Sequence, residues 1–238
     1  MKMRYPAFLA ALVLLVVLLT ACANQSAGPA AKPDVSSFRT VGATVRFGSY
    51  EQDGKSGNGK EGIDWVVVAV KSDKALLVSK VGLEARIYNA APFSVWKDTT
   101  LRLWLNTGFL NSAFTQQEKA AIATTRVDNG ASQGGGLYGV TSSASSEDQV
   151  FLLSYAELNS YRANKHGLYS SVSVSAKNQG TVEKGFWMRN QGMDGDRDEI
   201  LRTAGVVEGT GIWSDIVTSE HYVCPAIWVD LNSAYFAN

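Results

Sequence analysis

The sequence predicts an α+β domain with a mainly antiparallel sheet and two or three short helices. Strand patterns come first, capped helices follow in the middle of the chain, and short strand patterns return towards its end. That order favours strands and helices that are segregated along the chain over alternating βαβ units. A hydrophobic share of 45% is typical of globular domains, so the chain can bury a sizeable core.

The first strands are predicted from alternation and from β-branched runs. Residues 43–47 alternate between apolar and polar side chains, and residues 63–70 (IDWVVVAV) form a run typical of a buried strand. Residues 75–80 (ALLVSK) follow after the polar turn 71–74. These three segments predict a first set of strands that begins near residue 42.

The middle of the chain carries helix signals. Asp98 or Thr99 can cap a short helix over residues 101–105, and two capping boxes, Thr115 with Glu118 and Ser154 with Glu157, open two more. The remaining predictions are a loop over residues 128–147 and strands over 149–153, 186–189, 200–207 and 222–230.

The N-terminus predicts export and a lipid anchor. Lys2 and Arg4 precede an apolar run over residues 7–19, which is shorter than the ~20 residues that span a bilayer and fits a signal peptide. The run ends in Leu19-Thr20-Ala21-Cys22, which resembles a bacterial lipobox, so Cys22 is the predicted site of acylation, for example by palmitate. We expect a protein exported and anchored to the cell membrane or outer membrane; an uncleaved N-terminal anchor is the alternative.

The predicted domain organisation follows from this anchor. Residues 1–21 are a lipoprotein signal peptide, and residues 22–40 are the lipidated cysteine with a flexible tether, because large apolar side chains are scarce there. Residues 41–238 form a single globular domain. Cys22 and Cys224 are the two cysteines, so acylation of Cys22 leaves Cys224 without a disulfide partner.

The charge balance argues against nucleic acid as a partner. Cleavage after Ala21 leaves 20 basic against 22 acidic side chains, and the sequence has no basic cluster of the kind that binds phosphate backbones. The membrane, reached through lipid on Cys22, and a glycan or envelope protein are the expected partners.

The folded part resembles a bacterial domain family of unknown function, DUF6273. The matching segments, in order along the chain, are residues 47–52 (FGSYEQ), 63–67 (IDWVV), 75–79 (ALLVS), 101–106 (LRLWLN), 150–154 (VFLLS), 186–189 (FWMR) and 223–228 (VCPAIW). The family has no established activity, so the resemblance implies no catalytic residues. Its closing segments are similar to C-type-lectin-like and formylglycine-generating-enzyme-like folds, which implies C-type-lectin-like character at the level of the fold alone. Cys224 stands where the family usually has an arginine.

Two segments resemble ligand-binding loops. Residues 54–61 nearly spell a phosphate-binding loop, but Glu61 stands where a Ser or Thr would hold magnesium, and a strand follows, so a polar hairpin loop is the better interpretation. Asp194, Asp196 and Asp198 alternate in a loop and are candidate calcium ligands, with Asp215 as a distant addition. A solvated acidic turn is the alternative, and no other cofactor is expected.

His166 and His221 are the two histidines, and His221 lies three residues before Cys224. A Cys–His pair can form a nucleophile, but residues three apart on a strand face opposite sides, and Cys224 lies in an apolar run. Cys224 is therefore predicted to be buried and inert. Histidine and cysteine are too few for a zinc site.

The six tryptophans divide into two groups. Trp65, Trp104, Trp187 and Trp228 lie within apolar or family-matching segments and are predicted to pack in the core. Trp96 and Trp213 lie beside turns and are the candidates for contact with a ligand.

These observations predict a lipid-anchored binding module of the cell envelope for a glycan or protein ligand, with no catalytic residues assigned. The first alternative is an envelope enzyme, hydrolytic or oxidative, whose carboxylates do not pair in the sequence. The second is a non-catalytic envelope scaffold.

Overall fold

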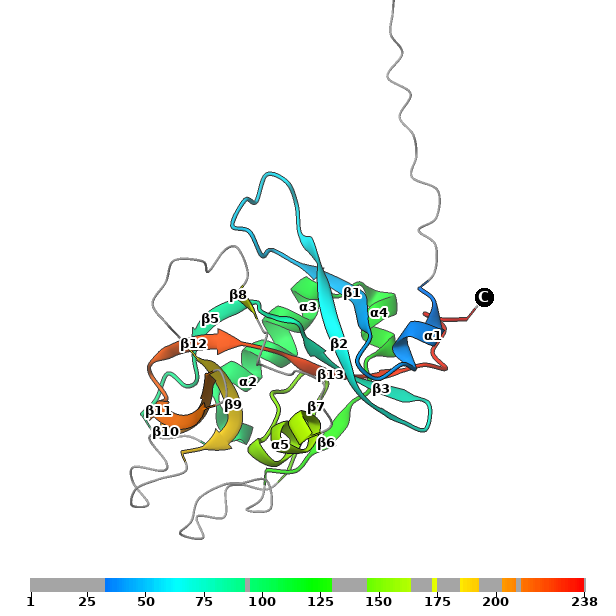
Figure 1. Cartoon of the computed structure of the whole chain (residues 1–238). Helices are drawn as coiled ribbons and strands as arrows, with labels where there is room; N and C mark the ends of the chain where they lie inside the picture. The colour runs from blue at the N-terminus through cyan, green and yellow to red at the C-terminus, as the bar shows by residue number, and fades with distance from the viewer. Residues whose placement is uncertain are drawn as a thin grey trace, which may run out of the picture. The chain divides into compact units, whose positions relative to one another are not determined.

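The computed structural model describes residues 33–92, 95–129, 145–163, 173–174, 185–192, 203–208 and 211–237. Lys32–Asn238 forms one compact unit, rich in antiparallel sheet and accompanied by short helices (Figure 1). The predicted α+β class with a mainly antiparallel sheet is confirmed. Among the described residues, no helix is both long enough and apolar enough to cross a membrane.

The first sheet has four strands in the order β1-β2-β3-β13, each antiparallel to its neighbours. The strands are β1 (Thr44–Tyr50), β2 (Glu61–Lys71), β3 (Lys74–Ser79) and β13 (Ala226–Asp230). Trp65 of β2 and Leu77 of β3 are fully buried, as their apolar segments predict. A bulge in β1 contains Gly48, whose φ of +71° and close approach to the ring of Phe114 exclude a side chain there.

The second sheet has five strands in the order β11-β10-β9-β12-β5, with β9 and β12 parallel and the other neighbours antiparallel. The strands are β5 (Glu84–Ile87), β9 (Phe186–Gln191), β10 (Thr203–Glu208), β11 (Gly211–Ile216) and β12 (Glu220–Val223). Two further pairs are short: β4 (Val81–Gly82) lies parallel to β8 (Ser173–Val174), and β6 (Thr125–Val127) lies antiparallel to β7 (Ser146–Asp148).

Two predicted strands are wrong. The segment 222–230 forms two strands in different sheets, because Pro225 has no N–H for a ladder and the chain passes there from β12 to β13. The segment 149–153 is not a strand, although Phe151 makes an isolated bridge with Ala226. The strand in this region is β7, which begins in the predicted loop 128–147 and ends at Asp148.

The helices are short, and α2, α4 and α5 begin where the capping residues predict. They are α1 (Val35–Phe38), η1 (Trp96–Asp98), α2 (Thr100–Trp104), the π-helical turn η2 (Leu105–Phe109), α3 (Leu110–Ala113), α4 (Gln116–Ala121) and α5 (Tyr155–Ala163). The Thr99 hydroxyl caps α2, and the capping boxes predicted at Thr115 and Ser154 both form. These hydrogen bonds satisfy N–H groups that a helix start otherwise leaves unpaired.

A buried arginine joins the second sheet to the segments around it. Arg189 of β9 is 2% exposed, and its guanidinium donates to the carbonyl oxygens of Leu152 and Asp128 and to the carboxylate of Glu157, at 2.5, 3.1 and 2.9 Å. The Arg189 carbonyl accepts a hydrogen bond from the Tyr88 hydroxyl at 2.7 Å. A buried charge is tolerated only when it is paired and hydrogen-bonded, so these contacts fix the relative positions of the segments that supply them.

The C-terminal part of the predicted tether 22–40 is folded. Asp34 caps α1, and Phe38 is 2% exposed and lies edge-on to Phe47 and Phe236, with ring centroids 6.3 and 4.9 Å away. Arg39 forms an ion pair with Asp73. Residues 33–40 are therefore part of the folded unit, because one large aromatic side chain is enough to attach them to the core.

Replacement of Phe38 by alanine should lower the free energy of unfolding by about 3–5 kcal/mol, the usual cost of truncating a buried phenylalanine. Urea unfolding of the Lys32–Asn238 unit measures this change. Leu103, which is 62% exposed, provides the matched control, because Leu103→Ala should stay within about 0.5 kcal/mol of the parent. A Phe38→Ala variant as stable as the parent would show that α1 is part of the tether.

Candidate functional site

A pocket of about 280 Å³ opens beside the first sheet, close to the lower end of the ~300–1,000 Å³ typical of ligand pockets. Its lining combines three cationic side chains, two threonines and one tryptophan: Lys71, Lys74, Arg126, Thr124, Thr125 and Trp228. These residues come from the end of β2, the start of β3, the middle of β13 and the segment around the start of β6.

The hairpin between β2 and β3 supplies the two lysines. Lys71 and Lys74 are direct partners in the ladder and flank a two-residue turn of Ser72 and Asp73. Ser72 has a φ of 52°, the conformation that so tight a turn between two strands requires. The lysines are therefore held opposite each other at the end of the sheet.

The edge strand β13 supplies the tryptophan. The Ala123 N–H donates to the carbonyl oxygen of Trp228 at 2.8 Å, and Ile122 forms a bridge with Val229. These two contacts hold the chain after α4 alongside β13. They bring Thr124, Thr125 and Arg126 next to the ring of Trp228.

The pocket has a cationic rim and an aromatic wall. Lys71 Nζ lies 5.8 Å from the centroid of the Trp228 ring, within the range of a cation–π contact. Lys71, Lys74, Thr124 and Arg126 are exposed, whereas Trp228 is half-buried and packs against the core. Such a surface can hold a ligand with both a flat apolar face and polar or negatively charged groups.

The structure buries one of the two tryptophans that the sequence predicts at the surface and exposes the other. Trp96, expected at the surface, is 1% exposed, and its indole N–H donates to the buried Asp148 carboxylate at 3.0 Å, so it cannot contact a ligand. Trp213 is 40% exposed on β11, as its place beside a turn predicts. Trp65 and Trp187 are buried, as expected, and Trp104 is half-buried against the core.

Trp228 is the site residue that sequence reasoning missed. Its apolar segment predicts a position in the core. The alternation in β13 carries the missed signal, because Ile227 and Val229 are fully buried whereas Trp228 and Asp230 are half-buried.

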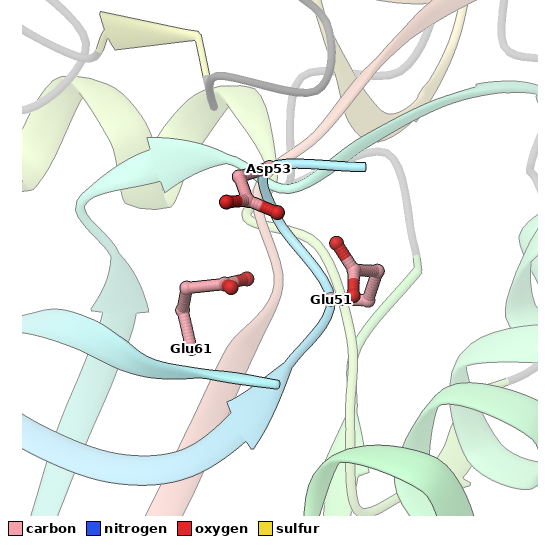
Figure 2. A group of neighbouring side chains, drawn as sticks. All are labelled: Glu51, Asp53 and Glu61. Atoms are coloured by element: carbon pink, nitrogen blue, oxygen red, sulfur yellow. The ribbon is translucent and has the colours of Figure 1, made fainter. Parts of the chain in front are cut away.

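A group of three carboxylates lies where the β1–β2 hairpin loop begins and ends (Figure 2). One oxygen each of Glu51, Asp53 and Glu61 lies within 4.8 Å of the others. Tyr50 pairs with Glu61 in the ladder, so closing the hairpin brings together acidic residues that stand about ten apart in the sequence. Residues 51–60 form the loop between β1 and β2, which confirms a polar hairpin loop in place of a phosphate-binding loop.

The loop already supplies hydrogen bonds to all three carboxylates. Glu61 accepts from the N–H of Gln52 at 2.6 Å, and Glu51 accepts from the N–H of Gly54 at 2.7 Å. Asp53 accepts from the N–H of Lys55 at 2.8 Å and from the Asn58 amide, and these bonds lower the pKa of the Asp53 carboxyl. The group therefore closes the hairpin, and its geometry alone does not establish a metal site.

His221 is held by Asp215 and by two tryptophan rings. It is 4% exposed, its Nε2 lies 2.7 Å from Asp215 Oδ2, and its ring is edge-on to Trp187 and Trp213 at 4.5 and 5.4 Å. Its Nδ1 is buried and has no hydrogen-bond partner among the residues that the structure describes. The imidazole therefore has a fixed orientation, but neither solvent nor a substrate reaches Nδ1 in this arrangement.

Cys224 is fully buried and its thiol contacts Ser79, whereas His221 bonds Asp215. The structure thus gives the thiol and the imidazole different partners. Cys22, His166 and the candidate calcium ligands Asp194, Asp196 and Asp198 lie outside the described residues.

Burial raises the pKa of the Cys224 thiol well above its ordinary value, so it should stay protonated and unreactive in the folded state. In the Lys32–Asn238 unit it is the sole cysteine. We expect negligible reaction with Ellman's reagent at pH 8 without denaturant and one equivalent of thiol in urea. Rapid labelling of the folded protein would show that the thiol is accessible.

Comparison with protein families gives one match. The model for the domain of unknown function DUF6273 matches residues 72–231, which is more than half of the chain and includes most of the pocket, from Lys74 to Trp228. Comparisons with curated proteins and with solved structures gave no match. The extent of the match shows that the chain belongs to the DUF6273 family.

Proposed function

We propose that this chain is a lipid-anchored protein of the cell envelope and that its folded domain is a binding module for a glycan. The observation that carries the proposal is the pocket between the β2–β3 hairpin and β13, with Trp228 as its wall. An aromatic ring beside converging hydroxyl and amino groups offers a sugar one apolar surface and several hydrogen-bonding groups.

The chemistry of the lining supports a glycan over an apolar ligand. A sugar ring has a face of C–H groups that can pack on an indole ring, and its hydroxyl groups can bond to Thr124 and Thr125. Lys71 and Lys74 add donors at the rim. A flat apolar patch, which would favour a protein partner, is a different kind of surface.

The anchor and the finer fold type belong to the same proposal. The lipobox-like segment that ends at Cys22 supports acylation and export. The C-type-lectin-like character rests on the resemblance of the closing segments. A carbohydrate-binding role is in keeping with both.

Binding to a glycan array by the full chain, purified in detergent, tests the binding role. We expect Trp228→Ala to abolish the signal and Thr124→Val to weaken it, because the first removes the wall and the second a hydroxyl. Trp213→Ala is the matched control, because Trp213 is the exposed tryptophan of the other sheet.

Two results would contradict this assignment. Loss of binding in Trp213→Ala with retention in Trp228→Ala would move the site to β11. A parent protein that binds no glycan would favour a scaffold or an enzyme. A thermal melt of each variant separates a lost site from a lost fold, and Thr124→Val is informative even if Trp228→Ala unfolds, because Thr124 is exposed.

Acylation is tested by expressing the full chain in bacteria with radioactive palmitate. The parent should carry the label and sediment with membranes, because several acyl chains together hold a protein on a bilayer. Cys22→Ala should carry no label, whereas Cys224→Ala should be labelled like the parent. Equal labelling of the parent and Cys22→Ala would exclude Cys22 as the acylated residue.

A further inference from the structure

The three cations of the pocket have no ion-pair partner among the described residues, whereas most of the described arginines have one. Five of the six arginines whose side chains the structure describes form ion pairs: Arg39, Arg46, Arg86, Arg102 and Arg189. Arg126 is the sixth. Within the described residues, none of Lys71, Lys74 and Arg126 takes part in an ion pair.

Two acidic residues near the lysines in the first sheet have other partners. Asp73, between the two lysines in the turn, forms its ion pair with Arg39 at 3.2 Å. Asp230, the ladder partner of Lys74 on β13, accepts from the Asn232 N–H at 2.9 Å. Glu147 lies opposite Arg126 in the β6–β7 ladder but forms no ion pair with it. Among the described residues, no carboxylate therefore forms an ion pair with the three cations of the rim.

The arrangement of the lysines is unfavourable for the sheet alone. Like charges directly opposite each other in an antiparallel ladder repel, and Lys71 and Lys74 occupy such positions. Arg126 adds a third positive charge at the same pocket. A negatively charged group placed among the three would relieve this repulsion and form charge-assisted hydrogen bonds.

We infer that the ligand is an anionic saccharide, whose phosphate or carboxylate group is bound among Lys71, Lys74 and Arg126 while its ring packs on Trp228. This inference rests on the proposed glycan-binding function and names the class of glycan. In both cases the ligand is a sugar with a fixed negative charge. A phosphodiester-linked polymer and a polymer of acidic sugars are the two sources that would supply it.

Ligand-observed NMR titration of the full chain in detergent tests this class, with glucose 6-phosphate, glucuronate and glucose as probes. We expect both acidic sugars, or one of them, to bind about tenfold or more tightly than glucose, and this preference to shrink as salt is raised, because exposed charges are screened. The stronger of the two acidic probes identifies phosphate or carboxylate as the favoured group.

The double variant K71Q/K74Q should lose the preference for the acidic probes, so that it binds glucose 6-phosphate and glucuronate no more tightly than it binds glucose. K71R/K74R should keep the preference, because arginine retains the charge. Lys80→Gln is the matched control, since it removes one exposed charge just beyond the other end of β3.

The outcomes separate this inference from the function on which it rests. Equal affinity for glucose and the acidic sugars, with all binding lost in Trp228→Ala, would overturn the anionic ligand and leave a neutral glycan in the same pocket. Binding of none of the three sugars would overturn both. An acidic preference that K71Q/K74Q leaves intact would also overturn the inference, because the charge would then be recognised elsewhere.

Discussion

The buried guanidinium of Arg189 is the interaction on which the arrangement of the fold depends most. It lies in the core within β9, directly after three apolar residues, and its donors reach Leu152, Asp128 and Glu157 on neighbouring segments. A buried cation without such partners would cost several kcal/mol, so the segments that surround β9 have little freedom to rearrange. Glu157 also caps the start of α5, which couples the helix to the sheet.

The charges at the candidate site are arranged differently from those in the core. In the core, Arg189 pairs with Glu157 and Asp148 pairs with Arg102, and these charges position the chain. At the pocket beside β13, the domain gathers three positive charges and leaves them to solvent. The first arrangement is understandable from stability alone, whereas the second places two like charges opposite each other and is the basis of the proposed anionic ligand.

Much of the secondary structure was predictable because its causes are local. The β-branched run of β2 and the capping boxes at Thr115 and Ser154 act over a few residues, and the structure contains each of them. The predictions were wrong where a contact between residues far apart in the sequence determines the structure. Phe38 attaches a polar segment to the core through Phe236, about two hundred residues away, and Trp96 is buried because Asp148 accepts its N–H. The pocket was missed for the same reason, since it brings together residues 71–74, 124–126 and 228.

We propose above all that Trp228 and the cations beside it form the ligand site. The most direct test is a two-dimensional NMR spectrum of the six indole N–H groups, recorded during titration with the glycan that binds most tightly. The account predicts that the Trp228 signal shifts progressively to saturation. The signals of Trp96, which is buried against Asp148, and of Trp213, on the other sheet, should stay in place. A shift of Trp213 alone, with Trp228 unmoved, would contradict the account.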